Sequence, residues 1–428
     1  MNISTEEWKQ FTSDITTFYE ELKSNDNGKL ADYIPQLANV DSNLFAISIT
    51  TINNQTFNIG DFSKHFCIQS CCKPLNYALA LQEHGEDTVS KHIGIEPSGS
   101  AFNSFLFDKS NKPFNALINA GAIMSTSLIK SNDTQDKRFD FIIEKWKSII
   151  GDNNIGFDNS VYLSEKRTAH RNYALAHLMM ENNIFPKNST IENTLELYLQ
   201  SCSISMNTEG LSKFAAMLAN GGQTVDTHKQ ILPSSIVKNI LCVMYSSGMY
   251  DYSGRWGHYV GLPAKSGVSG SIFVVIPNFG GICVYSPKLD QIGNSVRGVE
   301  FFHKLIKNYK LHIFDTLVNG LEKKKSIGNS ISTLNKLCDA CSKNNLDKVK
   351  SILSNNSFDI NTGDYDNRRA LHIATDDKNY ECIKLLIEHK ADFNVQDRWG
   401  MTPLQKAIEY NDETILSLFN YKKEESLQ

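Results

Sequence analysis

The chain has 428 residues, of which 41% are hydrophobic and 21% charged, and its formal net charge is -4. This length favours two or three domains, and the composition excludes a disordered chain. The acidic balance and the lack of a basic stripe argue against nucleic acid as a partner. Nine cysteines, mostly inside apolar runs, indicate a reducing compartment and no disulfide framework.

The amino-terminal region predicts an amphipathic helix over residues 5–23, because Trp8, Phe11, Ile15 and Leu22 recur at helical spacing. Its acidic start has neither an apolar signal core nor an Arg-rich transit character. We therefore expect a cytoplasmic protein, or a mitochondrial one if a transit peptide precedes this sequence. The apolar stretches are far too short to cross a membrane, so no membrane is expected as a partner.

Strands are expected early and late in the first 312 residues. Residues 44–52 and 55–60 read as a hairpin, and residues 271–277 and 281–285 as a later pair followed by a helix at about 294–309. The intervening chain reads as helical to about residue 240. This order predicts an α+β domain, residues 1–312, in which one antiparallel sheet is made from both ends and a helical lobe is inserted.

A polar segment, residues 313–335, is a predicted linker, and an internal repeat follows it. Residues 364–374 recur as residues 397–407, at an offset of 33 residues. That period, with Thr402-Pro403-Leu404 opening a helix, resembles ankyrin repeats. We expect an all-α ankyrin domain over 336–421, able to bind a protein partner, and a polar tail over 422–428.

The chemistry centres on Ser70 and Lys73, which form an S-x-x-K pair. Three residues on a helix bring both side chains onto one face, so a neutral lysine can take the serine proton and create a nucleophile. Ser127-Lys130 and Ser235-Lys238 match the same pattern. Only Ser70 follows an apolar extended run and precedes a proline in the first helical turn, and this context favours it.

A second element, Lys265-Ser266-Gly267-Val268, directly precedes the 271–277 strand. It resembles the K-[ST]-G element that accompanies S-x-x-K in penicillin-binding proteins and β-lactamases. A glycine-rich strand edge lets backbone N–H groups approach a substrate carbonyl. The N–H groups of Ser70 and Val268 are therefore candidates for an oxyanion hole.

With further motifs in order, the chain is similar to the serine-dependent glutaminase family, and in particular to the animal kidney- and liver-type enzymes with carboxy-terminal ankyrin repeats. The motifs are Ala31–Ala38, Gln69–Leu75, Glu96–Gly99, Asn119–Ile123, Ser164-Glu165, Arg171-Asn172, Ala219–Gly222, Gly248–Asp251 and Leu262–Val268. The resemblance implies a β-lactamase/penicillin-binding-protein-like fold for the first domain. It also implies hydrolysis of the side-chain amide of L-glutamine to glutamate and ammonia.

The resemblance also assigns roles. It implies that Ser70 is the nucleophile, Lys73 its general base, Tyr250 the proton relay to ammonia, and Val268 an oxyanion donor. The implied substrate-binding residues are Tyr33, Gln69, Ser70, Asn119, Glu165, Asn172, Tyr198, Tyr250 and Val268. A glutamine carries an α-ammonium for Glu165 and an α-carboxylate for the amides and tyrosine hydroxyls.

No metal or organic cofactor is implied, and the histidines lack metal-ligand spacing. The animal relatives imply a homodimer or homotetramer and activation by phosphate. Ala101 stands where those relatives carry a basic residue, so phosphate activation and assembly beyond a dimer stay open. Two other interpretations also stay open, a penicillin-recognising serine hydrolase and a catalytically inactive ankyrin scaffold.

Overall fold

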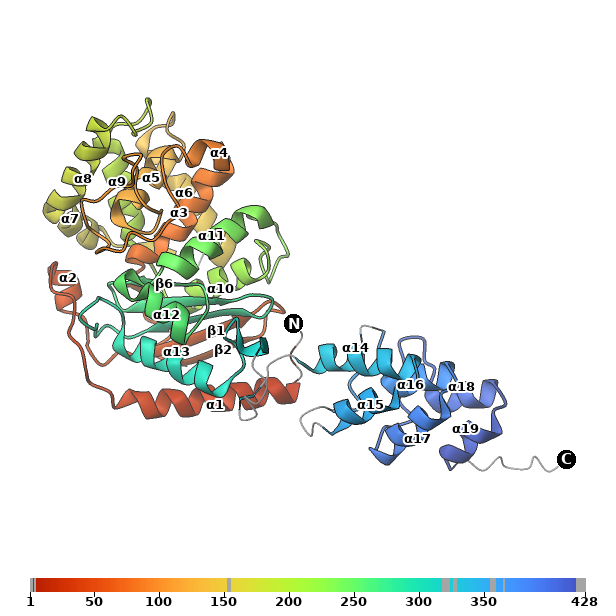
Figure 1. Cartoon of the computed structure of the whole chain (residues 1–428). Helices are drawn as coiled ribbons and strands as arrows, with labels where there is room; N and C mark the ends of the chain where they lie inside the picture. Colours follow the sequence, from red (N-terminus) through yellow and green to blue (C-terminus); the bar gives the residue numbers. More distant parts are fainter. Residues whose placement is uncertain are drawn as a thin grey trace. The chain divides into compact units, whose positions relative to one another are not determined.

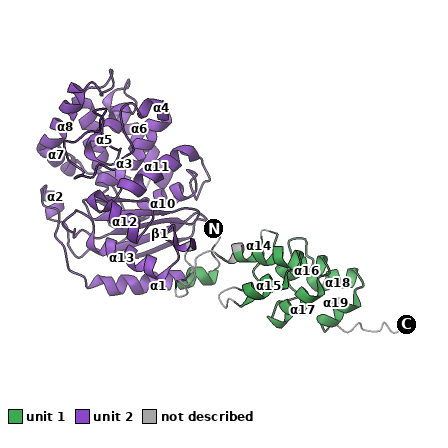
Figure 2. Ribbon diagram, in the orientation of Figure 1, with its two compact units in different colours: residues 1–10, 326–428 green, residues 11–325 purple. Residues whose placement is uncertain are grey.

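The computed structural model describes the chain apart from residues 1–2, 4, 152–154, 318–323, 326–328, 355–358, 365 and 421–428. Its contacts divide the chain into two compact units, residues 11–325 and residues 1–10 with 326–428 (Figure 2). The tail predicted at 422–428 lies outside the described residues.

A five-stranded antiparallel sheet, with strand order β2-β1-β8-β7-β6, forms the base of the larger unit. β1 (Ala46–Thr51) and β2 (Thr56–Gly60) make the early hairpin, and β7 (Ser271–Ile276) and β8 (Gly280–Tyr285) make the later one. β1 pairs with β8, so the two ends of this unit share one sheet. The mixed fold with an antiparallel sheet is therefore confirmed. The edge strand β6 (Ala264–Gly267) was expected only as a glycine-rich approach to β7.

Helices cover both faces of this sheet: α10 (Thr208–Ala219) lies on one face, and α13 (Val296–Asn308) with residues 11–23 of α1 (Thr5–Lys23) on the other (Figure 1). Alternation along β7 explains the two layers. Phe273 packs against Phe214 of α10, with ring centroids 5.4 Å apart, whereas Ile272 contacts α13. The predicted helices at 5–23 and about 294–309 thus match α1 and α13.

The helical lobe is inserted between β2 and β6 and lies above the α10 face of the sheet (Figure 1). Its main helices are α3 (Lys73–His84), α5 (Asn119–Leu128), α6 (Gln135–Ile150), α7 (Asn159–Thr168), α8 (His170–Glu181), α9 (Ile191–Cys202) and α11 (Ser234–Ser247). A small sheet of order β3-β5-β4 was not predicted. Its strands, Phe66–Cys67, Ile204–Met206 and Ile155–Phe157, are too short to show alternation.

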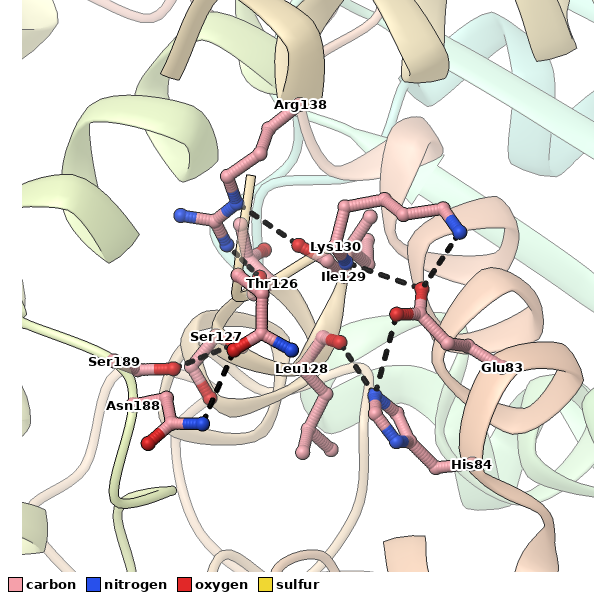
Figure 3. Close-up of polar contacts among 11 residues, drawn as sticks. Glu83, His84, Thr126, Ser127, Leu128, Ile129, Lys130, Arg138, Asn188 and Ser189 are labelled. Atoms are coloured by element: carbon pink, nitrogen blue, oxygen red, sulfur yellow. Dashed lines mark hydrogen bonds and ion pairs between the residues drawn. The ribbon is translucent and has the colours of Figure 1, made fainter. Parts of the chain in front are cut away.

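The carboxyl end of α5, the central helix of the lobe, is held by side chains from its neighbours (Figure 3). Arg138 of α6 is 3% exposed, and its guanidinium donates to the carbonyls of Thr126 at 2.8 Å and Ile129 at 2.9 Å. The Ser189 hydroxyl donates to the carbonyl of Ser127. A cation and hydrogen-bond donors satisfy the free carbonyls and the negative end of the helix. This fixes α5, which begins with Asn119.

The smaller unit consists of paired helices, which confirms the helical ankyrin region. The pairs are α14 (Asn329–Ser342) with α15 (Leu346–Leu353), α16 (Ala370–Asp376) with α17 (Tyr380–Glu388), and α18 (Pro403–Glu409) with α19 (Glu413–Leu418). The segment 313–335, predicted as a linker, includes η4 (Asp315–Leu317) and the start of α14. The Thr402 hydroxyl caps α18 by accepting from the Gln405 N–H at 3.0 Å.

Candidate active site

One pocket of about 340 Å³, here called the first pocket, gathers eight of the residues singled out from the sequence. They are Tyr33, Gln69, Ser70, Asn119, Glu165, Asn172, Tyr198 and Val268. Seven come from the helical lobe and the segment before β1, and Val268 comes from the edge of the sheet. The pocket therefore lies where the lobe meets the sheet.

Ser70 lies in η1 (Gln69–Cys72), a short turn that continues directly into α3. The preceding residue, Gln69, has a left-handed φ of 49°, which costs of order 1–3 kcal/mol for a residue with a side chain. The Gln69 amide is tethered, because its Nε2 donates to Glu165 Oε1 at 3.0 Å. A strained and tethered residue thus precedes the candidate nucleophile.

Lys73 begins α3, one turn after Ser70, and is fully buried. Its Nζ donates to Asn119 Oδ1 at 2.8 Å and to the carbonyl of Leu117 at 3.2 Å. Burial lowers the pKa of Lys73 to about 8, because desolvation disfavours the charged amine. A usable fraction of this amine is therefore neutral at physiological pH.

Tyr250 begins η3 (Tyr250–Tyr252) and also has a left-handed φ, 53°. Burial raises the pKa of Tyr250, and the nearby Ser70 hydroxyl opposes that rise. Among the residues the structure describes, its hydroxyl has no partner at full hydrogen-bond geometry, so it is adjacent to Ser70 but not aligned with it. Tyr250 lines a neighbouring pocket of about 380 Å³, here called the second pocket.

Glu165 of α7 forms the acidic end of the first pocket. Its Oε1 accepts from the Tyr33 hydroxyl at 2.6 Å and from Gln69 Nε2 at 3.0 Å, while burial raises the pKa of the carboxyl. Nearby, Asn119 Nδ2 donates to Asn172 Oδ1 at 3.2 Å. One carboxylate and two amides therefore face a cavity that can hold a small molecule with an ammonium and a carboxylate.

The edge strand β6 packs directly on the turn that carries Ser70. A Cβ atom on Gly267 would lie only 2.9 Å from the carbonyl oxygen of Ile68, so glycine permits this close approach. Val268 follows at the end of β6 and lines the first pocket. Val268 is thereby brought to the same cavity as Ser70.

Lys265, for which no role was predicted, is fully buried on β6. Its Nζ donates to the carbonyls of Ser266 at 2.7 Å and Gly248 at 3.2 Å, and lies 4.6 Å from the centre of the Tyr250 ring. Burial and the nearby Lys73 lower the pKa of Lys265 to about 7. The sequence signal that could have identified Lys265 as a site residue was its place in the K-S-G element.

Arg171 and Phe102 also line the first pocket without having been predicted. Arg171 Nε donates to the carbonyl of Asn103 at 2.7 Å, and its guanidinium lies 4.4 Å from the centre of the Phe105 ring. The sequence had placed Arg171 in a motif but assigned a role only to the following residue, Asn172. These contacts hold the 102–105 segment at the pocket.

Over the described part of the chain, no group of three or more His, Cys, Asp or Glu side chains is arranged to hold a metal ion. In the same residues, no helix combines the length and apolarity needed to cross a membrane.

Comparisons with known proteins define the class. Residues 28–314 match the model of the glutaminase family, and residues 337–426 match a model of three ankyrin repeats. A probable glutaminase, ybaS, has a solved structure that superposes with a TM-score of 0.67 at 35% identity, covering 70% of this chain and 96% of that one. Mglu in its glutamate form gives a TM-score of 0.67 at 34% identity, covering 71% and 69%.

Longer relatives match both units. Putative glutaminase 3 of Caenorhabditis elegans is 41% identical over 96% of this chain and 71% of its own length. The mitochondrial liver isoform of glutaminase from Mus musculus is 38% identical over 96% and 69%. This chain therefore belongs to the glutaminase family, the amidohydrolases that convert glutamine to glutamate and ammonia. Within that family it is of the kidney- and liver-type kind, with carboxy-terminal ankyrin repeats.

Proposed function

We propose that this glutaminase hydrolyses the side-chain amide of glutamine through an acyl-enzyme on Ser70. The observation that carries the proposal is the pairing of Ser70, open to the first pocket, with the buried Lys73 one helical turn away. Lys73 takes the Ser70 proton as the oxygen attacks the δ-carboxamide carbon. The N–H groups of Ser70 and Val268 hold the oxyanion.

The second half of the reaction releases both products. The carbon–nitrogen bond breaks as ammonia leaves with a proton passed from Lys73 or through Tyr250, and a γ-glutamyl ester stays on Ser70. Water then attacks the ester carbon, giving up a proton to the same groups. The bond between that carbon and the Ser70 oxygen breaks, the proton passes to Ser70, and glutamate leaves. The proximity of Tyr250 and Ser70 supports the relay.

Substrate recognition follows from the polar ends of the first pocket. We assign the α-ammonium of glutamine to Glu165, and its α-carboxylate to Asn119, Asn172 and the hydroxyls of Tyr33 and Tyr198. Gln69 positions Glu165 through its amide. A site that hydrogen-bonds both groups discriminates against amides that lack either one.

The remaining expectations belong to this proposal as well. The S-x-x-K and K-S-G elements support a β-lactamase/penicillin-binding-protein-like fold for the larger unit. The family supports a homodimer or homotetramer that works without a cofactor, and the repeats support a protein partner. The acidic net charge supports no nucleic-acid partner. The nine free cysteines support a reducing compartment, for which we propose the cytoplasm.

The test is covalent labelling with an electrophilic glutamine analogue, combined with Ser70→Ala. Wild type should be labelled on the peptide containing Ser70 and should release glutamate, and Ser70→Ala should do neither. Ser127→Ala and Ser235→Ala, from the two competing S-x-x-K matches, are the control variants and should behave as wild type. Glutamate release by Ser70→Ala at the wild-type rate would remove the assigned nucleophile.

A further inference from the structure

The second pocket adjoins the first behind a wall of two aromatic rings. Phe102 lines both pockets, and its ring lies 4.7 Å from the ring of Tyr250, which lines the second. The hydroxyl of Ser70, which lines the first pocket, nevertheless lies close enough to oppose the rise that burial causes in the pKa of Tyr250. Tyr250 therefore reaches from the second pocket to the candidate nucleophile.

The lining of the second pocket mixes polar and apolar residues and carries one negative charge. Its polar residues include Ser98, Ser100, Asn115, Ser247, Asp251 and Ser253 besides Tyr250, its apolar ones are Pro97, Phe102, Leu117 and Ile118, and Asp251 is exposed to solvent. No lysine, arginine or histidine occurs among the described residues that line it. Such a surface suits a small neutral or cationic polar molecule and disfavours an anion.

The order of bond breaking gives a second opening a use. When ammonia forms, the γ-glutamyl group is still esterified to Ser70, with its head group between Glu165 and Asn172. The acyl group then lies in the first pocket, between Ser70 and these head-group contacts. A second opening beside Ser70 lets ammonia leave, and water reach the ester, without passing that group.

We propose that the second pocket is the chamber through which ammonia leaves and the hydrolytic water arrives. This inference rests on the acyl-enzyme proposed above. Tyr250 delivers the proton to the leaving nitrogen at the boundary of the two pockets. Ammonia enters the chamber, departs past Asp251, and takes up a proton from the buffer in bulk solvent. A water molecule takes its place beside the ester.

The chamber can be narrowed at Gly254, in the first turn of α12 (Ser253–Tyr259). A Cβ atom there meets no heavy atom within 4 Å, so Gly254→Leu adds bulk without a clash at the backbone. Gly257→Leu is the matched control, because Gly257 lies on the same helix outside the lining, and its Cβ would make only ordinary contacts with Tyr245. Ser247→Leu narrows the chamber independently from α11.

The experiment follows the fate of the acyl-enzyme when hydroxylamine competes with water. Gly254→Leu and Ser247→Leu should lower the ratio of γ-glutamyl hydroxamate to glutamate by about threefold or more, since hydroxylamine is larger than water, and should slow ammonia release. Labelling of Ser70 by the glutamine analogue, which enters through the first pocket, should keep its wild-type rate. Gly257→Leu should match wild type throughout.

Each outcome distinguishes this inference from the proposed function. If the ratio of γ-glutamyl hydroxamate to glutamate is unchanged in both Gly254→Leu and Ser247→Leu, and Ser70 is labelled normally, the role of the second pocket is wrong. The proposed acyl-enzyme is not affected by that result. A similar fall in Gly257→Leu would also overturn the role of the second pocket, because the effect would come from α12 and not from the pocket. If Gly254→Leu fails to fold, Ser247→Leu decides. Wild-type turnover by Ser70→Ala would instead remove the acyl-enzyme.

Discussion

The two units of this chain differ in whether their charged side chains are buried. The larger unit buries Lys73, Lys265 and Arg138 almost completely. In the described part of the ankyrin unit, no lysine, arginine or carboxylate is buried to that degree, and ion pairs such as Arg398 with Asp366 lie near the surface. Buried charge costs stability, whereas exposed pairs contribute little. We therefore expect the buried charges to destabilise the larger unit, and the buried Lys73 to be kept there because the proposed catalysis requires it.

Replacing Lys73 should have the largest effect and tests this difference between the two units most directly. Lys73→Met should lower kcat/KM on the order of 10³-fold, because the serine loses its base. Its free energy of unfolding should change little, since the removal of a desolvated amine offsets the loss of the donor to the Leu117 carbonyl and Asn119 Oδ1. Glutamate-release assays and urea unfolding measure the two effects. Lys213→Met, which removes only a pair with Glu209, is the control.

The same lysine predicts the pH dependence. Neutral amine is the base, so kcat/KM of wild type should rise with pH through about 8. The folded-state pKa values of Lys73 and Lys265, about 8 and about 7, lie below the ordinary lysine value of 10.5. The unfolded chain thus binds more protons between about pH 7 and 10, and these groups make stability rise with pH there. A steady loss of kcat/KM from pH 6 to 9 would contradict the assignment.

Features of the fold and site that depend on local sequence could be predicted, whereas those that depend on contacts between distant segments could not. The periodicity of residues 5–23 and the 33-residue repeat predicted their helices because the signal is local. The small β3-β5-β4 sheet was not predicted, because its short strands are stabilised by pairing with distant segments. Lys265 was visible in a motif, but its burial follows from the packing of β6 on η1, which no local pattern encodes.

A smaller loss is expected when the charge that faces the substrate is removed. Glu165→Gln should raise KM and lower kcat/KM about 10- to 100-fold, because the α-ammonium loses its charged partner. Steady-state kinetics with glutamine measure this change. Glu196→Gln is the matched control, since Glu196 pairs with Lys166 on the neighbouring surface and does not line the first pocket. Equal KM values for the two variants would contradict the assignment of Glu165.

The buried cation that serves structure alone should affect stability and spare the chemistry. Arg138→Met leaves the carbonyl of Ile129 without its donor and that of Thr126 with only the Ile129 N–H, and should cost about 2–3 kcal/mol of unfolding free energy. Below the melting range, kcat/KM per folded molecule should remain close to wild type, because Arg138 contacts the carboxyl end of α5 (Figure 3), whereas Asn119 begins that helix. Denaturant unfolding followed by tryptophan fluorescence provides the measurement. A large fall in kcat/KM without destabilisation would show that Arg138 takes part in the chemistry.

The smallest effect should come from the ankyrin unit, where stability is a sum of local terms. Thr402→Ala removes the hydroxyl that accepts from the Gln405 N–H, and loss of such a cap costs about 1 kcal/mol. Thr402→Ser keeps the acceptor and should retain most of that energy. Because the cap lies in a separate compact unit, kcat/KM with glutamine should equal that of wild type. Calorimetry should show the loss in the ankyrin transition alone, and a matching loss of kcat/KM would mean that the repeats act directly on catalysis.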